Sequence, residues 1–209
     1  MKQHFPERAA ELLPGFQLYL DELYAINAQV NLVSRQMVKE DYWQYHFLDS
    51  LLIFKCMDLV GGKALDFGTG GGLPGIPVKL VRPEMDMTLL DSVGKKAKCL
   101  DHIIDALRLK NCSAVWSRLE DYAKAMPGNR FDYILCRSVR MEPAFFEPMF
   151  KLLKSDGKAI FYKAHQAEDV TVLPGIKVFD VSREELGKRQ IIIAPKRSFE
   201  MYLKNRKLG

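Results

Sequence analysis

The stretch Ala64-Leu65-Asp66-Phe67-Gly68-Thr69-Gly70-Gly71-Gly72-Leu73-Pro74-Gly75 decides how this chain folds. A short apolar run ends beside an aspartate, a glycine-rich turn follows, and the next residues can begin a helix. Glycines at this density allow positive φ angles and let backbone N–H groups approach a ligand closely. A unit of strand, glycine-rich turn and helix is typical of the nucleotide-type cofactor sites of α/β proteins.

The segments that follow residue 63 alternate between strand-like and helix-like patterns. The helical patterns are clearest at Lys95–Leu109 and Pro143–Leu153. Two late β-type runs, Val178–Val181 and Gln190–Ile193, are separated by too few residues for a helical crossover, so we expect them to pair antiparallel. The sequence thus predicts an α/β fold with a mostly parallel sheet, helices on both faces and an antiparallel C-terminal hairpin. The other expected strands are Ala64–Phe67, Met87–Leu90, Ser113–Trp116, Tyr133–Cys136 and Ala159–Tyr162.

The part before the glycine-rich turn has the pattern of a helical extension. Apolar residues recur at helical spacing over Pro6–Ala28, with Pro14-Gly15 as a candidate break. A second helix is predicted over Met37–Met57 and is expected to end by Gly61-Gly62. We therefore divide the chain into an N-terminal helical extension packed on the core, residues 1–60, and one α/β unit, residues 61–209.

Length and composition indicate an ordinary globular protein. The 209 residues are 48% hydrophobic and 27% charged, with a formal net charge of +5, which permits a polyanionic partner without requiring one. No apolar run approaches the ~20 residues of a membrane span, and the charged start Met1–Arg8 lacks the pattern of a signal peptide. We expect a cytoplasmic protein without membrane association. The cysteines form no C-x-x-C pair, so we expect free thiols and no metal site at Cys56, Cys99, Cys112 and Cys136.

The glycine-rich turn alone does not identify the cofactor, but the residues near it favour one candidate. Gly70, Gly72 and Gly75 spell G-x-G-x-x-G, which also fits NAD. However, Asp66 would repel a pyrophosphate and suits a ligand with an ammonium group, while Asp91 ends the next strand, where a carboxylate can accept from ribose hydroxyls. The antiparallel end of the sheet is also unusual for nicotinamide-binding domains. S-adenosylmethionine is therefore favoured, with NAD(P) and a turn that binds nothing as the alternatives.

Several segments, taken together, resemble one known family. They are Asn31-Leu32-Val33, His46-Phe47-Leu48-Asp49-Ser50-Leu51, Leu65–Pro77, Leu89-Leu90-Asp91-Ser92 with Lys95-Lys96, Arg118-Leu119-Glu120, Phe131-Asp132, Arg137-Ser138-Val139 and Phe161-Tyr162-Lys163. In this order they resemble the bacterial 16S rRNA guanine-N7 methyltransferases, also called glucose-inhibited division protein B. The resemblance runs from about Asn31 to Ala194.

The resemblance implies a class I S-adenosylmethionine-dependent methyltransferase, Rossmann-like, with a seven-stranded sheet. The implied acceptor is N7 of one guanosine in the decoding-region loop of 16S rRNA, either free or in the small ribosomal subunit, and we expect a monomer. Ser138 and Ala164 stand where the family commonly has Ala and Gly, so the RNA contacts are less well defined than the cofactor site. The cofactor contacts implied by the family are Gly68, Leu73, Leu119, Glu120 and Arg137, and Asp91 matches the ribose-binding acidic position of the wider methyltransferase class. Gly70 of the glycine-rich turn completes the expected cofactor site.

Methylation at guanine N7 requires no general base, because this nitrogen carries an in-plane lone pair and no proton. We assign no catalytic residue and name Arg137 and Lys163 as candidates for positioning the acceptor, since both end strand runs on the ligand-binding side of the sheet. Cys136 also ends a strand run, but its apolar neighbours favour a buried core thiol over a nucleophile.

Some features allow two interpretations. His46, Asp49 and Ser50 either tether the N-terminal helices to the sheet or contact RNA or cofactor. The basic residues from Lys196 onward either form a flexible tail or contact rRNA. A methyltransferase acting on a small molecule or protein, and a non-catalytic cofactor-binding interaction protein, remain the alternative functions.

Overall fold

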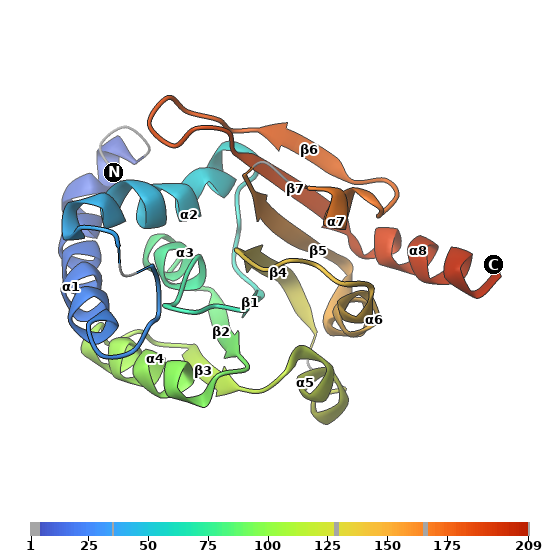
Figure 1. Cartoon of the computed structure of the whole chain (residues 1–209), viewed down its shortest axis with the longest axis horizontal. Helices are drawn as coiled ribbons and strands as arrows, with labels where there is room; N and C mark the ends of the chain where they lie inside the picture. The colour runs from blue at the N-terminus through green and yellow to red at the C-terminus, as the bar shows by residue number, and fades with distance from the viewer. Residues whose placement is uncertain (1–4, 35, 128–129, 165–166, 209) are drawn as a thin grey trace.

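The structure, a computed structural model, describes residues 5–34, 36–127, 130–164 and 167–208, which surround a seven-stranded sheet (Figure 1). The strand order is β3-β2-β1-β4-β5-β7-β6, and all pairs are parallel except β5–β7 and β6–β7. The expected parallel sheet and antiparallel hairpin are therefore confirmed. The strands are β1 (Lys63–Phe67), β2 (Asp86–Asp91), β3 (Cys112–Trp116), β4 (Phe131–Arg137), β5 (Leu153–Lys163), β6 (Lys177–Asp180) and β7 (Gln190–Pro195).

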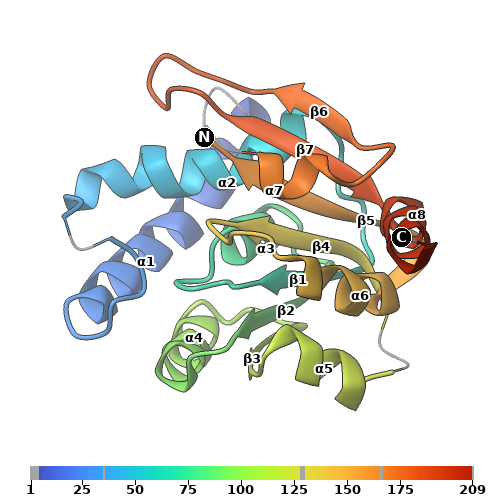
Figure 2. The ribbon, with the colours of Figure 1, turned by 45° about the vertical axis from the view of Figure 1, so that its right-hand side comes forward.

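Helices cover both faces of the sheet (Figures 1 and 2). One apolar cluster joins one face of the sheet to α1, α3 and α4, and a second joins the other face to α5, α6 and α8. Strand β2 lies on one side of β1 and β4 lies on the other, so the strand order reverses between β1 and β4. In open α/β sheets, ligands bind at such a point. The longer helices are α1 (Ala9–Asn27), α3 (Gly75–Val81), α4 (Gly94–Ala106), α5 (Leu119–Ala125), α6 (Pro143–Leu152) and α8 (Lys196–Leu208).

The first helix does not break at Pro14-Gly15, the candidate break. Helix α1 continues through Pro14 because its buried side chains hold it against α3 and α4, and this packing outweighs the hydrogen bond that a proline removes. Gly15 lies against α3, where a Cβ would be 3.1 Å from Cδ2 of Leu80.

The predicted single helix over Met37–Met57 is wrong in detail. The chain instead forms a 3-10 turn at Lys39–Asp41, a π-helical segment at Trp43–Leu48, one α-helical turn (α2, Asp49–Leu51) and a 3-10 turn at Leu52–Lys55. The wide π turn lets Phe47 stack on Tyr19 of α1, with ring centroids 5.1 Å apart, while the next residues reach the sheet.

The basic C-terminal segment forms helix α8, so the flexible-tail interpretation is wrong. Phe199 is fully buried, and its ring lies 5.8 Å from that of Phe146 in α6. Tyr202 meets the same Phe146 ring edge-on at 4.9 Å. Two aromatic residues three positions apart therefore give this charged helix one packed face.

Among the described residues, no helix is both long and apolar enough to cross a membrane. Residues 1–4, which belong to the segment inspected for a signal peptide, lie outside the described residues, as does the side chain of Lys207 in the basic segment.

Candidate active site

The glycine-rich turn joins β1 to α3 at the carboxyl edge of the sheet. The backbone N–H groups of Gly68 and Thr69 donate to the carbonyl of Leu90 at 2.9 and 3.1 Å, which fastens the turn to β2. Gly68 has a φ of +72°, and a Cβ there would lie 2.4 Å from Cγ2 of Val139. The absence of a side chain at Gly68 therefore lets the turn and the segment after β4 approach each other.

Asp66 lies fully buried beneath the turn and holds its shape. Its Oδ2 accepts hydrogen bonds from Oγ1 of Thr69 at 2.6 Å and from the backbone N–H of Gly75 at 2.8 Å. Burial raises the pKa of Asp66 to about 6, although both hydrogen bonds act in the opposite direction. Its Oδ1 accepts no hydrogen bond from any described residue, so a buried acceptor remains beside the turn for a donor such as an ammonium group.

Asp91 ends β2 next to the turn, as the sequence predicted. One carboxylate oxygen accepts from the backbone N–H of Gly70 and the other from that of Val93, each at 2.9 Å. A carboxylate has about four lone-pair positions, so Asp91 can still accept from ligand hydroxyls. Together with the orphaned Oδ1 of Asp66, the free lone pairs of Asp91 fit a ligand that carries an ammonium group and a ribose.

The other residues expected to bind cofactor differ in exposure. The side chains of Leu73 and Leu119 are buried in the apolar core, with 3% and 1% exposure. Both leucines are buried as whole residues, so a ligand contact at either stays a prediction. Glu120 is half-buried in the first turn of α5, just after the end of β3.

Arg137 ends β4 and contacts the N-terminal helical segment. Its Nη1 donates to Oδ2 of Asp49 at 3.0 Å and to the carbonyl of Tyr45 at 3.2 Å. Arg189, just before β7, donates from Nε to the other oxygen of Asp49 at 2.8 Å. Arg137 at the end of β4 and Arg189 just before β7 thus share one carboxylate, which leaves this wall of the site positively charged.

His46 and Ser50 complete the junction between the N-terminal segment and the sheet. Burial, and then the nearby Arg137 charge, lower the pKa of His46 to about 4, so its ring is neutral near pH 7. The Ser50 hydroxyl donates to the carbonyl of His46 at 2.6 Å, and the Tyr162 hydroxyl of β5 donates to the carbonyl of Ser50 at 3.0 Å. These contacts support the tethering interpretation of the motif that contains His46, Asp49 and Ser50.

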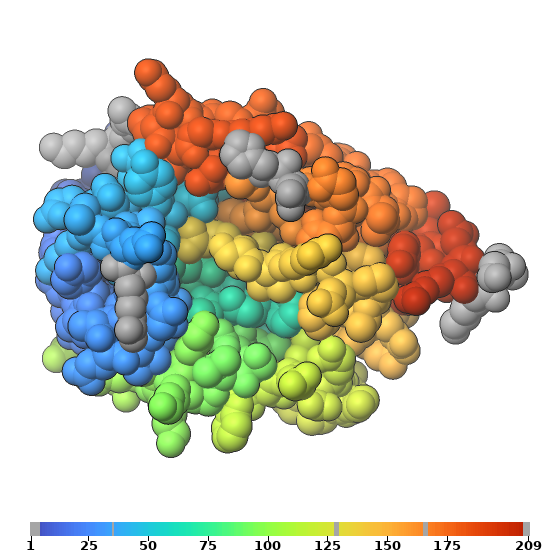
Figure 3. Space-filling view, in the orientation of Figure 1, coloured from blue at the N-terminus to red at the C-terminus, as the bar shows by residue number. Residues whose placement is uncertain are grey.

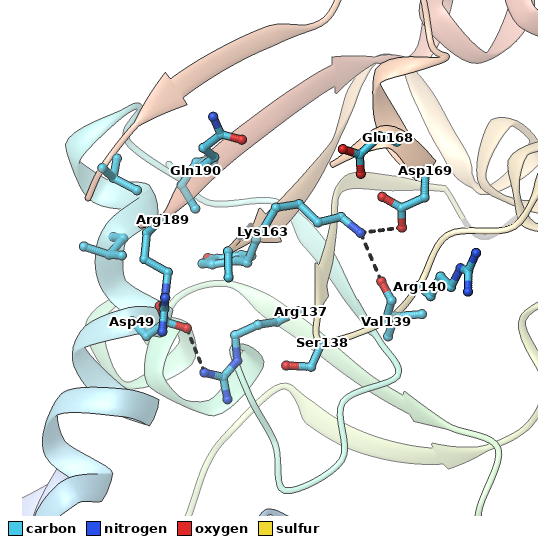
Figure 4. A pocket seen from close by; sticks show the side chains of 15 residues that line it. Asp49, Arg137, Ser138, Val139, Arg140, Lys163, Glu168, Asp169, Arg189 and Gln190 are labelled. Atoms are coloured by element: carbon cyan, nitrogen blue, oxygen red, sulfur yellow. Dashed lines mark hydrogen bonds and ion pairs between the residues drawn. The ribbon is translucent and has the colours of Figure 1, made fainter. Parts of the chain in front are cut away.

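A cavity of about 910 Å³ opens beside Arg137, and Figure 4 shows its lining side chains. Its walls come from the ends of β4 and β5, the start of β7 and the short helix α7 (Glu168–Thr171). On the same face of the molecule, Figure 3 shows a hollow over the glycine-rich turn; it lies between the blue N-terminal part, green α4 and the yellow segment after β4, with the teal segment after β1 in its floor. Arg137 and Lys163 line this cavity, whereas the glycine-rich turn, Asp91, Leu119 and Glu120 do not.

Lys163 and Asp169 form an ion pair on the cavity wall. The Nζ of Lys163 donates to Oδ2 of Asp169 at 2.6 Å and to the carbonyl of Val139 at 3.3 Å. The backbone N–H of Met141 donates to the same Oδ2 at 2.7 Å. This pair connects the end of β5, the segment after β4 and α7 around the cavity.

Sequence reasoning missed both Asp169 and Arg189. Asp169 is one of 26 acidic residues and belongs to none of the segments that resemble the family. Arg189 directly precedes the predicted strand Gln190–Ile193. An antiparallel strand begins there at the ligand-binding edge of the sheet, and this position is the one signal that could have identified Arg189 as a site residue.

Cys136 is 2% exposed, and burial raises the pKa of its thiol well above the ordinary value. A buried, protonated thiol is a poor nucleophile, so the core interpretation of Cys136 is confirmed. All four cysteines are free.

Comparison with known proteins gives matches over most of the chain. A family model described as rRNA small subunit methyltransferase G matches residues 13–179. Ribosomal RNA small subunit methyltransferase G of Desulfitobacterium hafniense is 35% identical over 207 residues, which cover 92% of this chain and 84% of that protein. The protein of the same name from Oenococcus oeni is 34% identical over 191 residues, covering 89% and 74%.

Solved structures with low sequence identity share the fold. The crystal structure of precorrin-6y C5,15-methyltransferase from Geobacter metallireducens superposes with a TM-score of 0.55 at 14% identity, covering 71% of this chain and 87% of that one.

Proposed function

The chain belongs to the rRNA small subunit methyltransferase G family, and from this premise we propose that it methylates N7 of one guanosine in the decoding-region loop of 16S rRNA, with S-adenosylmethionine as the methyl donor. The observation that carries the proposal is the position of the large cavity. It lies directly beside the glycine-rich turn and is separated from it by Val139, which contacts both. A donor at the turn and a base in the cavity would therefore meet at the ends of β1 and β4.

We assign the donor to the residues around the turn. Gly68 and Gly70 give the turn its two positive-φ positions, and Asp91 accepts from the ribose hydroxyls. Leu73 and Leu119, which are buried in the structure, flank the site, and Glu120 and Arg137 complete it at its edges.

The chain's own residues act by positioning. When bound, S-adenosylmethionine would supply an electrophilic sulfonium methyl group for the N7 lone pair of guanine, with S-adenosylhomocysteine as the leaving group. Because N7 carries no proton, no residue has to remove one. Arg137, fixed by Asp49, and Lys163, fixed by Asp169, hold the acceptor, and the alignment of the two reactants supplies the rate enhancement.

We further propose that the enzyme works as a monomer in the cytoplasm, without a metal ion, and that it recognises its guanosine in 16S rRNA or in the small ribosomal subunit. The arginines and lysine around the cavity suit an RNA backbone, although the net charge of the chain is only +5.

Methyl transfer to ribosomal particles tests the proposal. We expect labelled methyl groups from S-adenosylmethionine to enter the 16S rRNA of small subunits from a strain that lacks the enzyme, and to be absent from subunits that are already modified. Label in ribosomal protein or in small molecules, with none in rRNA, would favour one of the alternative methyltransferases. Cofactor binding without any transfer would favour the non-catalytic alternative.

A further inference from the structure

The Lys163–Asp169 pair has hydrogen-bonding capacity that the protein does not use. Oδ2 of Asp169 accepts from Lys163 Nζ and from the backbone N–H of Met141, and Lys163 Nζ also donates to the carbonyl of Val139. Oδ1 of Asp169, in contrast, accepts no hydrogen bond from any described residue. Lys163 Nζ has three N–H groups and gives only two of them to these partners. The side chains of Lys163 and Asp169 are 9% and 17% exposed and line the cavity (Figure 4).

An unpartnered carboxylate oxygen next to a free ammonium N–H matches one nucleobase edge. Guanine presents two adjacent donors, N1–H and the exocyclic amino group, followed by the acceptor O6. Adenine and cytosine present a lone pair at the ring nitrogen of this edge, which a carboxylate repels, and uracil lacks the amino group. Oδ1 of Asp169 is buried in the structure, so binding a base requires a rotation about the Cβ–Cγ bond, a torsion that is soft in aspartate.

The order of the strands agrees with the order of the atoms on the base. From the glycine-rich turn outward, the carboxyl edge presents the end of β1, then Arg137 of β4, then Lys163 of β5. In Figure 4 the carboxylate of Asp169 lies on the far side of the Lys163 ammonium group from Arg137. On guanine, N7, O6 and N1 follow one another around the ring. A base with N1 at Asp169 and O6 at Lys163 therefore directs N7 toward the turn, where the methyl group is expected.

We propose that Asp169 selects guanine by accepting from N1–H and the exocyclic amino group of the target base, while Lys163 donates to O6. This inference rests on the proposed function and deepens it, because it names the residues that choose the base. Asp169 acts here through binding, not through proton transfer.

Replacement of the target guanosine by inosine, which lacks the amino group, tests the proposal. We expect the wild-type enzyme to lose about tenfold or more in kcat/KM on small subunits with inosine at the target, because one charge-assisted hydrogen bond is missing. In Asp169→Asn, activity on guanosine falls and most of the difference between the two bases disappears. Unchanged affinity for S-adenosylmethionine, measured by calorimetry, shows that the variant is folded.

The possible outcomes distinguish a failure of this proposal from a failure of the proposed function on which it rests. If the wild type does not methylate guanosine, the proposed function fails. If it methylates guanosine and inosine equally, or if Asp169→Asn keeps the full difference between them, guanine selection by Asp169 is overturned while the function stands. Glu168→Gln is the matched control, since Glu168 is the exposed neighbouring carboxylate of the same cavity. We expect it to keep the inosine effect, and loss of the effect in this variant alone would assign the selection to Glu168.

Discussion

Asp91 is the residue on which the proposed cofactor site depends most clearly. Its two oxygens accept from the backbone at Gly70 and Val93 and retain lone pairs for ribose hydroxyls. We expect Asp91→Ala to weaken S-adenosylmethionine binding by about 10- to 100-fold, the effect of losing hydrogen bonds to a charged acceptor. Isothermal titration calorimetry measures this. Asp86→Ala, at the exposed opposite end of the same strand, is the control and should leave the affinity unchanged; equal affinities for all three proteins would remove Asp91 from the site.

The raised pKa of Asp66 makes the stability of the protein depend on pH in a predictable direction. Its pKa in the folded state, about 6, lies above the ordinary value of 3.8, because burial disfavours the carboxylate. Such a group stabilises the fold fully below about pH 4 and loses that contribution as the pH rises through about 6. The shift corresponds to about 3 kcal/mol in the free energy of unfolding.

We therefore expect the wild type to lose stability relative to Asp66→Asn between pH 4 and pH 7, because the amide does not ionise. Urea unfolding of both proteins at the two pH values measures the difference, and contributions from other groups cancel in the comparison. A constant difference between the two proteins would mean that Asp66 does not titrate in this range.

At the level of secondary-structure elements, helix α8 shows how few apolar residues can fix a charged segment. Phe199 is fully buried against Phe146, whereas Met201 on the same helix is 49% exposed. We expect Phe199→Ala to lower the free energy of unfolding by about 3–5 kcal/mol, as large-to-small core changes do, and Met201→Ala to have little effect. Denaturant titration measures both. Similar small losses in the two variants would show that α8 does not pack on α6 in solution.

The elements that the sequence predicted are those with strong local signals. Apolar runs separated by helical patterns located all seven strands, and Arg137 and Lys163 do end β4 and β5. The π-helical segment and α8 were missed because tertiary contacts decide them. Phe47 leaves regular helical spacing to stack on Tyr19, and Phe199 and Tyr202 form a packed face only when Phe146 is beside them.

The residues of the candidate site that lie at the ends of strands could be predicted from the sequence. The turn after β1 and Asp91 after β2 were expected, and the structure places them together through the bond between Gly70 and Asp91. The ion pairs of Asp49 with Arg189 and of Lys163 with Asp169 could not be predicted, because each joins elements whose neighbours are known only from the three-dimensional fold. The division into an extension, residues 1–60, and a core, residues 61–209, stays a prediction.

On the scale of the whole molecule, one feature of the topology organises the function. The strand order reverses between β1 and β4, so the glycine-rich turn faces one side of this point and Arg137 and Lys163 lie on the other. The N-terminal segment closes the site from outside, because Asp49 binds arginines from β4 and from the start of β7. The proposed donor and acceptor sites are thus neighbours that share Val139 as their boundary.

Mass spectrometry of nucleosides tests N7 methylation of 16S rRNA most directly. Small subunits that lack the modification are incubated with the enzyme and S-adenosylmethionine, and their 16S rRNA is digested and analysed. We predict that 7-methylguanosine appears at up to one residue per 16S rRNA and that no other methylated nucleoside increases. An increase in a guanosine methylated at N1 or N2, in a methylated adenosine or cytidine, or in no methylated nucleoside at all, would contradict the proposed function.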